Sequence, residues 1–131
     1  FHAAHKLLLL AHSPKHYTEL GRLVAGAKGL PPTEVENRFG TLFMSALRVR
    51  ATAKKHVTVL HHILGYLKRD LDGRDKMEVL ELIADYHRGL VPLVVPLTLL
   101  KHHLARIPVP YLADQIYLSP HPKELMLRNH V

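Results

Sequence analysis

The sequence has 131 residues, with 18 Lys and Arg against 11 Asp and Glu, which gives a formal net charge of +7. It contains no Cys, which excludes disulfides, thiol nucleophiles, Cys-based zinc sites and Cys-ligated iron–sulfur clusters within this segment. With 47% hydrophobic and 22% charged residues, the composition is that of a folded globular chain. The basic surplus favours acidic partners, with nucleic acid ahead of an anionic membrane surface.

Three helices are expected in the N-terminal part, because the apolar residues repeat with a helical period and nowhere alternate as in a half-buried strand. Ser13-Pro14 is expected to start the second helix, with a hydroxyl for the N-cap and a proline at the first helical position. A break at 29–32 precedes the third helix. The expected apolar faces are Phe1, His5, Leu8, Leu9 and His12; Tyr17, Leu20, Leu23, Val24 and Ala27; and Val35, Phe39, Leu42, Phe43, Ala46 and Leu47.

Five more helical segments are expected in the rest of the chain. A fourth helix covers about 51–69, and Asp75 with Glu78 is interpreted as a capping box that begins a fifth, which Gly89 ends. A sixth helix, begun or kinked by two prolines, continues to Arg106, followed by a short helix at 111–118 and a last one at 123–130. The predicted buried residues of the fifth helix are Met77, Leu80, Ile83 and Ala84.

These segments predict an all-α fold, a single compact helical bundle of about six to eight helices in which residues 1–131 form one domain. The longest apolar run, Leu90 to Leu100, has 11 residues and contains two prolines, against the ~20 that a membrane-spanning helix needs. We therefore expect no membrane association and a cytoplasmic location.

The predicted fourth helix separates its apolar residues from its basic ones. On a helical wheel, its apolar side holds Ala53, His56, Val57, Leu60, Ile63, Leu64 and Leu67. Three doublets, each seven residues apart, share the opposite side in steps of roughly 10 Å. They are Lys54-Lys55, His61-His62 and Lys68-Arg69, with Thr58 and Gly65 in the same stripe.

This stripe is typical of a helix that lies along a polyanion, because Lys and Arg repeated along one face can each neutralise a phosphate. No acidic residue occurs between Leu47 and Arg69, and Arg48 and Arg50 extend the positive charge. The alternative is a solvated face, since every helix of a bundle exposes one polar side and Lys commonly occupies it. A solvated face usually carries both basic and acidic residues. Because this stripe has no acidic residue, the binding interpretation is slightly favoured, and both interpretations stay open.

The 12 histidines raise the question of a metal site. The pairs His2/His5 and His12/His16 have spacings that can place two imidazoles on one side of a helix, but a Ser-Pro break divides the second pair and no H-E-x-x-H motif occurs. We interpret His5, His12 and His56 as histidines of buried faces, each bonded to a backbone carbonyl. No metal site and no cofactor are predicted.

No catalytic motif appears in the sequence: a nucleophile elbow, a phosphate-binding glycine loop and a dinucleotide fingerprint are all absent. The sequence therefore favours a chain that is not an enzyme by itself. Lys101 and His102-His103, close to Arg106, are assigned to contact with a polyanion ahead of a metal.

Three long strings resemble the YbgA-like family, bacterial domains of unknown function, and the resemblance covers essentially the whole chain. They are 1–14 (FHAAHKLLLLAHSP), 91–103 (VPLVVPLTLLKHH) and 121–129 (HPKELMLRN). The middle of the chain matches as well, at Ala51, Thr52, His56, Leu60, His61, Gly65, Tyr66 and Lys68. Thr58 departs from the family, where Asn is expected, so a side-chain amide contact of its relatives is altered here.

The resemblance implies an accessory role. Some members of the family stand alone. In others the domain follows a cysteine-bearing desulfidase domain, which holds an iron–sulfur cluster and removes sulfur from thiouracil-type bases, including 4-thiouridine in tRNA. The YbgA-like part is then expected to help hold the tRNA. Because this chain has no Cys, the resemblance implies the binding half or a relative of it; an upstream desulfidase domain in the same gene product and a stand-alone protein both stay open.

The prediction is therefore a non-catalytic accessory domain that binds structured RNA, tRNA in the first place, through its phosphates. With five Tyr and three Phe, most of them on expected core faces, little base stacking and little sequence specificity are expected. A histidine-dependent metal enzyme and a protein–protein module remain as alternatives. The predicted RNA-binding residues are Arg48, Arg50, Lys54, Lys55, Thr58, His61, His62, Lys68, Arg69, Lys101, His102, Arg106 and Arg128.

Overall fold

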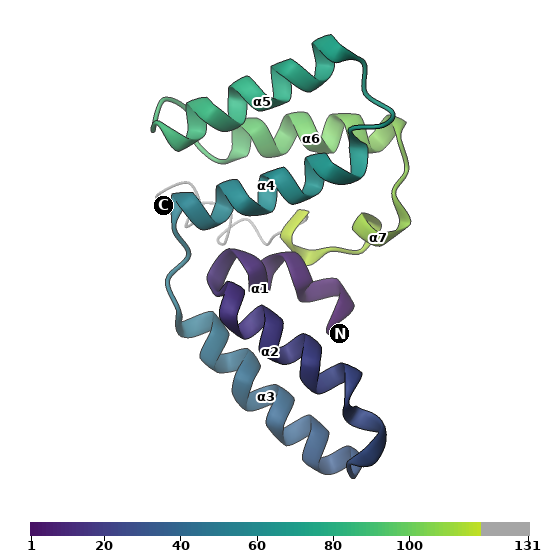
Figure 1. Cartoon of the computed structure of the whole chain (residues 1–131). Coiled ribbons are helices and arrows are strands. Elements are labelled where there is room, and N and C mark those ends of the chain that lie inside the picture. Colours follow the sequence, from purple (N-terminus) through teal and green to yellow (C-terminus); the bar gives the residue numbers. More distant parts are fainter. Residues whose placement is uncertain (119–131) are drawn as a thin grey trace.

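The computed structural model of the chain describes residues 1–118, which form α-helices and short 3-10 helices and contain no strand (Figure 1). The all-α fold is thereby confirmed; the helix expected at 123–130 lies outside the described residues. In this range no helix combines the length and the apolarity needed to cross a membrane. The α-helices are α1 (Lys6–His12), α2 (Pro14–Ala25), α3 (Pro32–Arg48), α4 (Ala53–Leu67), α5 (Gly73–His87), α6 (Val94–Arg106) and α7 (Pro110–Ala113), with 3-10 helices η1 (Ala3–His5), η2 (Ala27–Gly29) and η3 (Ile116–Leu118).

Two of the predicted helix ends, one N-cap and one C-terminal glycine, are confirmed. The Ser13 hydroxyl caps α2 by accepting the backbone N–H of His16 at 3.2 Å. Gly89, with a φ of +78°, follows the last turn of α5, as predicted. The capping box at Asp75 is wrong: Asp72 is the N-cap of α5 and accepts the N–H of Asp75 at 2.8 Å. The helix therefore begins at Gly73, and the segment expected as one helix at 111–118 is divided into α7 and η3.

Two expected apolar faces are only partly right. In α5 the predicted Ile83 is buried, but the other buried side chains are Val79 and Tyr86, whereas Met77 is 56% exposed. The predicted and the observed buried residues both have helical spacing. Only the packing of α5 against α4 and α6 decides which of them are buried. In α1 the buried residues are Leu7, Leu9, Leu10 and Ala11, instead of the expected face from Phe1 to His12.

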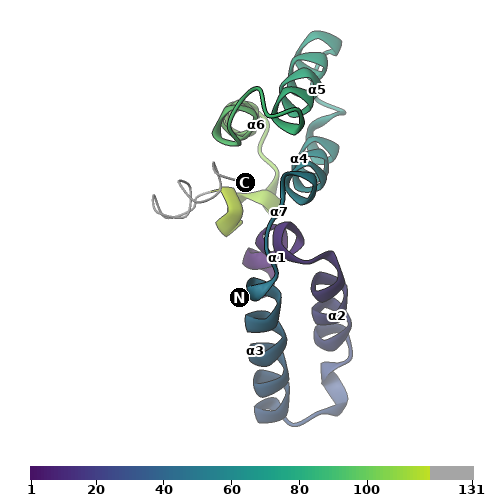
Figure 2. The same ribbon diagram turned by 90° about the vertical axis from the view of Figure 1, so that its left-hand side faces the viewer.

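The reason for the burial of α1 is that it has partners on two sides. Leu9 joins a small core with Leu20, Phe43 and Ala46 of α2 and α3. The other buried residues of α1 belong to the larger core that α4, α5 and α6 share. Figure 1 shows α1 between the α2–α3 hairpin and the α4–α6 layers, and Figure 2 shows α4 and α5 on one side of the molecule and α6 on the other.

A glutamine from the C-terminal part holds the start of α1. His5 provides no side-chain cap for α1. Instead the buried Gln115 accepts the N–H of Leu7 at 3.2 Å and donates to the carbonyl of Ala3 at 2.6 Å. Because the first N–H groups of a helix have no partner within it, this contact satisfies a buried donor from 108 positions away in the sequence.

Gln115→Leu is expected to lower the free energy of unfolding by about 2 kcal/mol, because it leaves the buried N–H of Leu7 without a partner and removes the bond to the part-buried carbonyl of Ala3. Urea unfolding followed by circular dichroism measures the change. The control is Asp114→Asn, a substitution at the exposed neighbour. Equal stability of the two variants would contradict the assigned role of Gln115.

The other end of α1 is bonded to the connection between α3 and α4. His12 Nδ1 lies 2.9 Å from the carbonyl oxygen of Val49. The half-buried Lys55 donates from Nζ to the carbonyls of His12, at 2.8 Å, and Arg50, at 2.9 Å. A cation beside the C-terminal carbonyls of a helix also complements the helix dipole. Lys55 therefore fixes the start of α4 against the end of α1.

Replacing Lys55 by Met keeps the length of the side chain and removes both charge-assisted bonds, so we expect a loss of about 1–2 kcal/mol in the free energy of unfolding. Lys54→Met is the matched control, because Lys54 is exposed and its side chain bonds to nothing in residues 1–118; a change within about 0.5 kcal/mol is expected there. The stability of both variants is compared by thermal unfolding. A Lys55→Met protein as stable as the wild type would contradict the assigned role of Lys55.

Candidate nucleic-acid interface

One side of α4 remains open to solvent while α1, α5 and α6 cover the rest of the helix. The buried side holds His56, Val59, Leu60, Ile63, Leu64 and Leu67, so that Val59 joins the predicted set while Ala53 and Val57 are only half-buried. We call the open side, with the residues that directly follow the helix, the α4 face. Its exposed residues are Lys54, Thr58, His61, His62, Gly65, Tyr66, Lys68 and Arg69.

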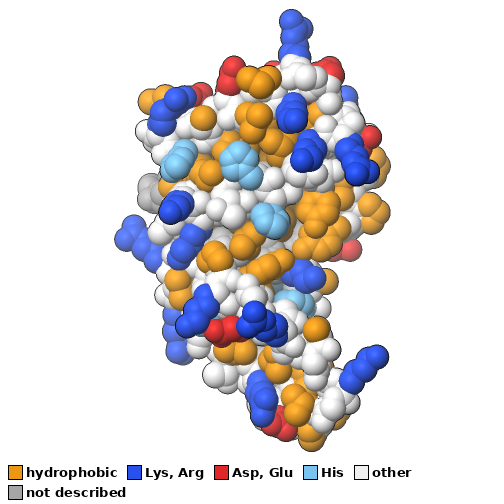
Figure 3. Space-filling view, viewed as in Figure 1, with side chains coloured by type: hydrophobic (Ala, Val, Ile, Leu, Met, Phe, Trp, Pro, Cys, Tyr) orange, Lys and Arg blue, Asp and Glu red, His pale blue; other side chains and the backbone are white. Residues whose placement is uncertain are grey.

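The cations of the α4 face form no ion pairs within residues 1–118. The ion pairs that the structure shows within residues 1–118 are Arg38–Glu34, Arg88–Asp85 and Arg106–Asp75, all outside this helix. In the space-filling view the basic and histidine side chains extend over α4, whereas acidic side chains gather along the upper edge, over α5 (Figure 3). The predicted separation of charge along α4 is thus present in the folded chain.

The structure divides the predicted binding residues into free and engaged cations. Lys54, Lys68 and Arg69 are exposed and have no bonding partner for their side chains in residues 1–118. Lys55 does not belong with them, since its ammonium group is bonded to two backbone carbonyls. Arg48 and Arg50 are exposed just before α4 and extend the basic region at its N-terminal end.

The predicted residues of α6 do not join the α4 face. Lys101 and His102 are exposed, but α6 lies on the other side of the molecule from α4 and α5 (Figure 2). Arg106 bonds to Nδ1 of the buried His103 at 2.8 Å and lies 3.6 Å from Asp75, so its charge is partly compensated. Arg128 lies outside the described residues.

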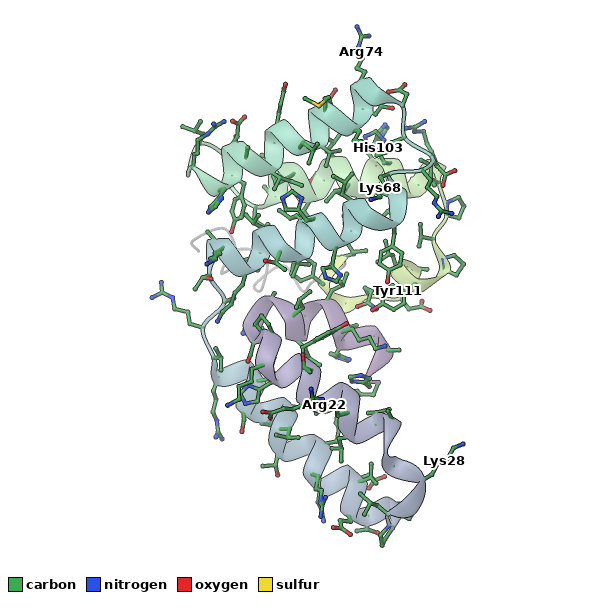
Figure 4. The ribbon with its side chains drawn as sticks, in the orientation of Figure 1. Arg22, Lys28, Lys68, Arg74, His103 and Tyr111 are labelled. Atoms are coloured by element: carbon green, nitrogen blue, oxygen red, sulfur yellow. The ribbon has the colours of Figure 1, made fainter. Side chains whose placement is uncertain are left out.

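Two other surface cations, Arg74 and Lys28, point away from this face (Figure 4). Arg74 points away from the start of α5, and Lys28 projects from the far end of the α2–α3 hairpin (Figure 4). Lys68 lies at the C-terminal end of α4, in the same part of the molecule as Tyr111 (Figure 4). The free positive charge on α4 is therefore local to that helix and the connection before it.

A shallow depression of about 540 Å³ lies in the middle of the α4 face. Its lining consists of Thr58, His61, His62, Gly65 and Tyr66. Gly65 leaves open space at its centre, because a Cβ at that position would meet no atom within 4 Å. The hydroxyl of Thr58 donates to the carbonyl of Lys54 at 3.3 Å, which leaves its oxygen available as an acceptor.

Tyr66 is the residue of this site that sequence reasoning missed, because tyrosines were assigned to core faces. Its ring is 45% exposed and stacks on Tyr111, with ring centroids 5.0 Å apart. Lys6 Nζ lies 5.8 Å from the centre of the Tyr111 ring. Burial and, to a smaller extent, the neighbouring Tyr17 and Tyr66 raise the pKa of Tyr111 to about 12. The available signal was its position directly after Gly65, at the edge of the basic stripe.

The three histidines assigned to buried faces have partners within the fold. His5 and His12 bond through Nδ1 to the carbonyls of Phe1 and Val49, which are the predicted kind of partner, but neither histidine is buried. For His56 the expected carbonyl is wrong: its buried Nδ1 bonds to the hydroxyl of Tyr117 at 2.7 Å. Over the described part of the chain, no three His, Asp or Glu side chains come together as metal ligands would.

Comparison with known proteins identifies the family. The model of a family described as protein of unknown function (DUF1722) matches residues 6–122. The uncharacterized protein YbgA of Escherichia coli (strain K12) is 32% identical over 130 residues, which cover 98% of this chain and 77% of that protein. No solved structure matches the chain. The chain therefore belongs to the YbgA-like family of proteins of unknown function, DUF1722.

Proposed function

We propose that the chain is a non-catalytic RNA-binding domain that holds structured RNA through the α4 face. The observation that carries this proposal is the set of exposed cations at both ends of α4, Lys54 at one end and Lys68 and Arg69 at the other. None of them forms an ion pair in residues 1–118, although Asp70 follows Arg69 in the sequence. Phosphate contacts made by such cations supply most of the affinity in sequence-independent nucleic-acid binding.

The position of Lys54 supports binding over solubility. It is the second residue of α4, where the partial positive charge of the helix dipole makes a cation unfavourable. Lys55, one residue on, is explained by its two carbonyl bonds. No comparable contact explains Lys54, so the fold alone gives no reason for a cation there. A bound phosphate would compensate both the side-chain charge and the helix terminus.

The length of the α4 face suits a nucleic-acid backbone. Lys54 and Lys68 are 14 positions apart, which corresponds to about 21 Å along a helix. A helix with cations at both ends can contact several phosphates of one RNA strand without inserting into a groove of the RNA. Recognition of this kind depends on the shape of the RNA more than on its sequence.

The family resemblance supplies the RNA that we propose, namely tRNA. Members fused to a desulfidase domain combine a cysteine-bearing catalytic part with a part of the present type. A chain that has no Cys cannot itself hold an iron–sulfur cluster by Cys ligation. We therefore extend the proposal to tRNA held for a desulfidase-type partner domain, which would remove sulfur from a thiolated base.

The alternative of a protein–protein module has one feature of its own. An apolar cleft of about 340 Å³ lies between the C-terminal half of α6 and α7, lined by Leu104, Val109, Leu112 and Leu118 among others. This cleft contains none of the residues of the α4 face, so the two functions can be tested separately. Ala105→Glu, which places a charge in the cleft, is expected to leave RNA affinity unchanged.

Lys54→Glu is expected to weaken tRNA binding about tenfold at 0.1 M salt and to flatten the slope of log affinity against log salt by about 0.9, the value for one phosphate contact. The same variant is expected to keep or raise stability, by about 0.3–1 kcal/mol, because an acid at a helix N-terminus is favourable. Fluorescence anisotropy with labelled tRNA at several salt concentrations, together with urea unfolding, separates the two effects. Lys68→Glu is expected to weaken binding similarly.

The matched control is Lys28→Glu, the same change of charge at an exposed lysine at the far end of the α2–α3 hairpin (Figure 4). It should retain wild-type affinity within about twofold. Wild-type tRNA affinity in the Lys54→Glu, Lys68→Glu double variant, or an equal loss in the Lys28 control, would contradict binding through the α4 face.

A further inference from the structure

The depression in the middle of the α4 face differs chemically from the two ends of that face. None of its five lining residues is Lys or Arg: it is formed by a tyrosine ring, two imidazoles, a threonine and a glycine. Lys54 precedes it by one helical turn, and Lys68 and Arg69 follow within about one turn. A phosphate would therefore be neutralised at either end of the face, but not in its middle.

We infer that this depression is the seat of an unpaired nucleobase, stacked on Tyr66 above Gly65. The inference rests on the proposed RNA-binding function and adds a base contact to it. Base–aromatic stacking is the usual way in which proteins hold bases that have left the RNA stack. Imidazole nitrogens of His61 and His62 and the Thr58 oxygen surround the seat, and each can bond to a base edge.

The exposure and support of Tyr66 favour this assignment. Of the five tyrosines, Tyr86 and Tyr117 are buried and Tyr17 and Tyr111 are half-buried, so that Tyr66 is the most exposed. Its stacking on Tyr111 restricts the ring before any ligand arrives. A ring that is already held in place loses little conformational entropy on binding, which increases the affinity that a stacked base can contribute.

Gly65 makes the seat accessible and provides a clean variant. A Cβ at position 65 meets no atom within 4 Å, so the side chain of Gly65→Leu starts from open space and extends into the depression. The substitution also replaces a poor helix former inside α4 and changes no charge. Gly40→Leu is the matched control, because Gly40 is an exposed helical glycine of α3 whose Cβ likewise meets open space.

The experiment compares two RNA hairpins with the same number of base pairs in their stems, one fully paired and one with a single bulged 2-aminopurine, so that they differ by that one nucleotide. The wild-type protein is expected to bind the bulged RNA at least about fivefold more tightly, since one stacked base contributes at least that factor. Binding should also change the fluorescence of the 2-aminopurine.

Gly65→Leu is expected to abolish both the preference for the bulged RNA and the fluorescence change, while its affinity for the paired RNA and its salt slope stay as in the wild type. Tyr66→Leu should lose the fluorescence change as well, and Gly40→Leu should behave as the wild type. Equal wild-type affinity for the two RNAs, or a preference that survives Gly65→Leu, would overturn the base seat and leave phosphate binding intact. If neither RNA binds, the RNA-binding function itself fails, and the base seat with it.

Discussion

The fold depends on the burial of α1 from two sides. This helix has seven residues, too few for stability by itself, and four of them are buried. Leu9 packs into the core of the α2–α3 hairpin, while Leu7, Leu10 and Ala11 pack into the core formed with α4, α5 and α6. Since each buried leucine contributes on the order of 1.5–3 kcal/mol, α1 is the element that joins the two parts of the bundle.

The same constraint decides which basic residues remain available for binding. Gln115 accepts a backbone N–H at the start of α1, and Lys55 donates to a backbone carbonyl at its end. One cation of the predicted stripe therefore has a structural role. Lys54, its neighbour, points to solvent and has no structural partner in the described residues. Two adjacent lysines thus differ in their contacts. A variant in which both are replaced would lose stability as well as a proposed binding residue, so the two effects could not be separated.

The α4 face consequently combines two chemistries along one helix. Its ends carry exposed cations that suit phosphates, and its middle is a partly aromatic depression over Gly65 that contains no Lys or Arg. Burial raises the pKa of Tyr111 to about 12, and its ring stacks on the exposed ring of Tyr66. A single-stranded or bulged RNA offers both kinds of partner in one molecule, charged backbone and planar base, which is why one surface can serve both contacts.

The sequence by itself determined the positions of most described helices, the Ser13 cap of α2, the Gly89 end of α5, the exposed basic stripe of α4 and the family, because these follow from local periodicity, from capping chemistry between residues a few positions apart, and from residue identity. The tertiary structure alone decided what each side chain meets. In the folded chain α1 is buried on two sides, and α5 buries Val79 and Tyr86 while Met77 is exposed. Lys55 is bonded to backbone carbonyls, Arg106 lies beside Asp75, and Tyr66 remains exposed. Each of these outcomes depends on groups brought together from distant positions, and helical spacing carries no information about such neighbours.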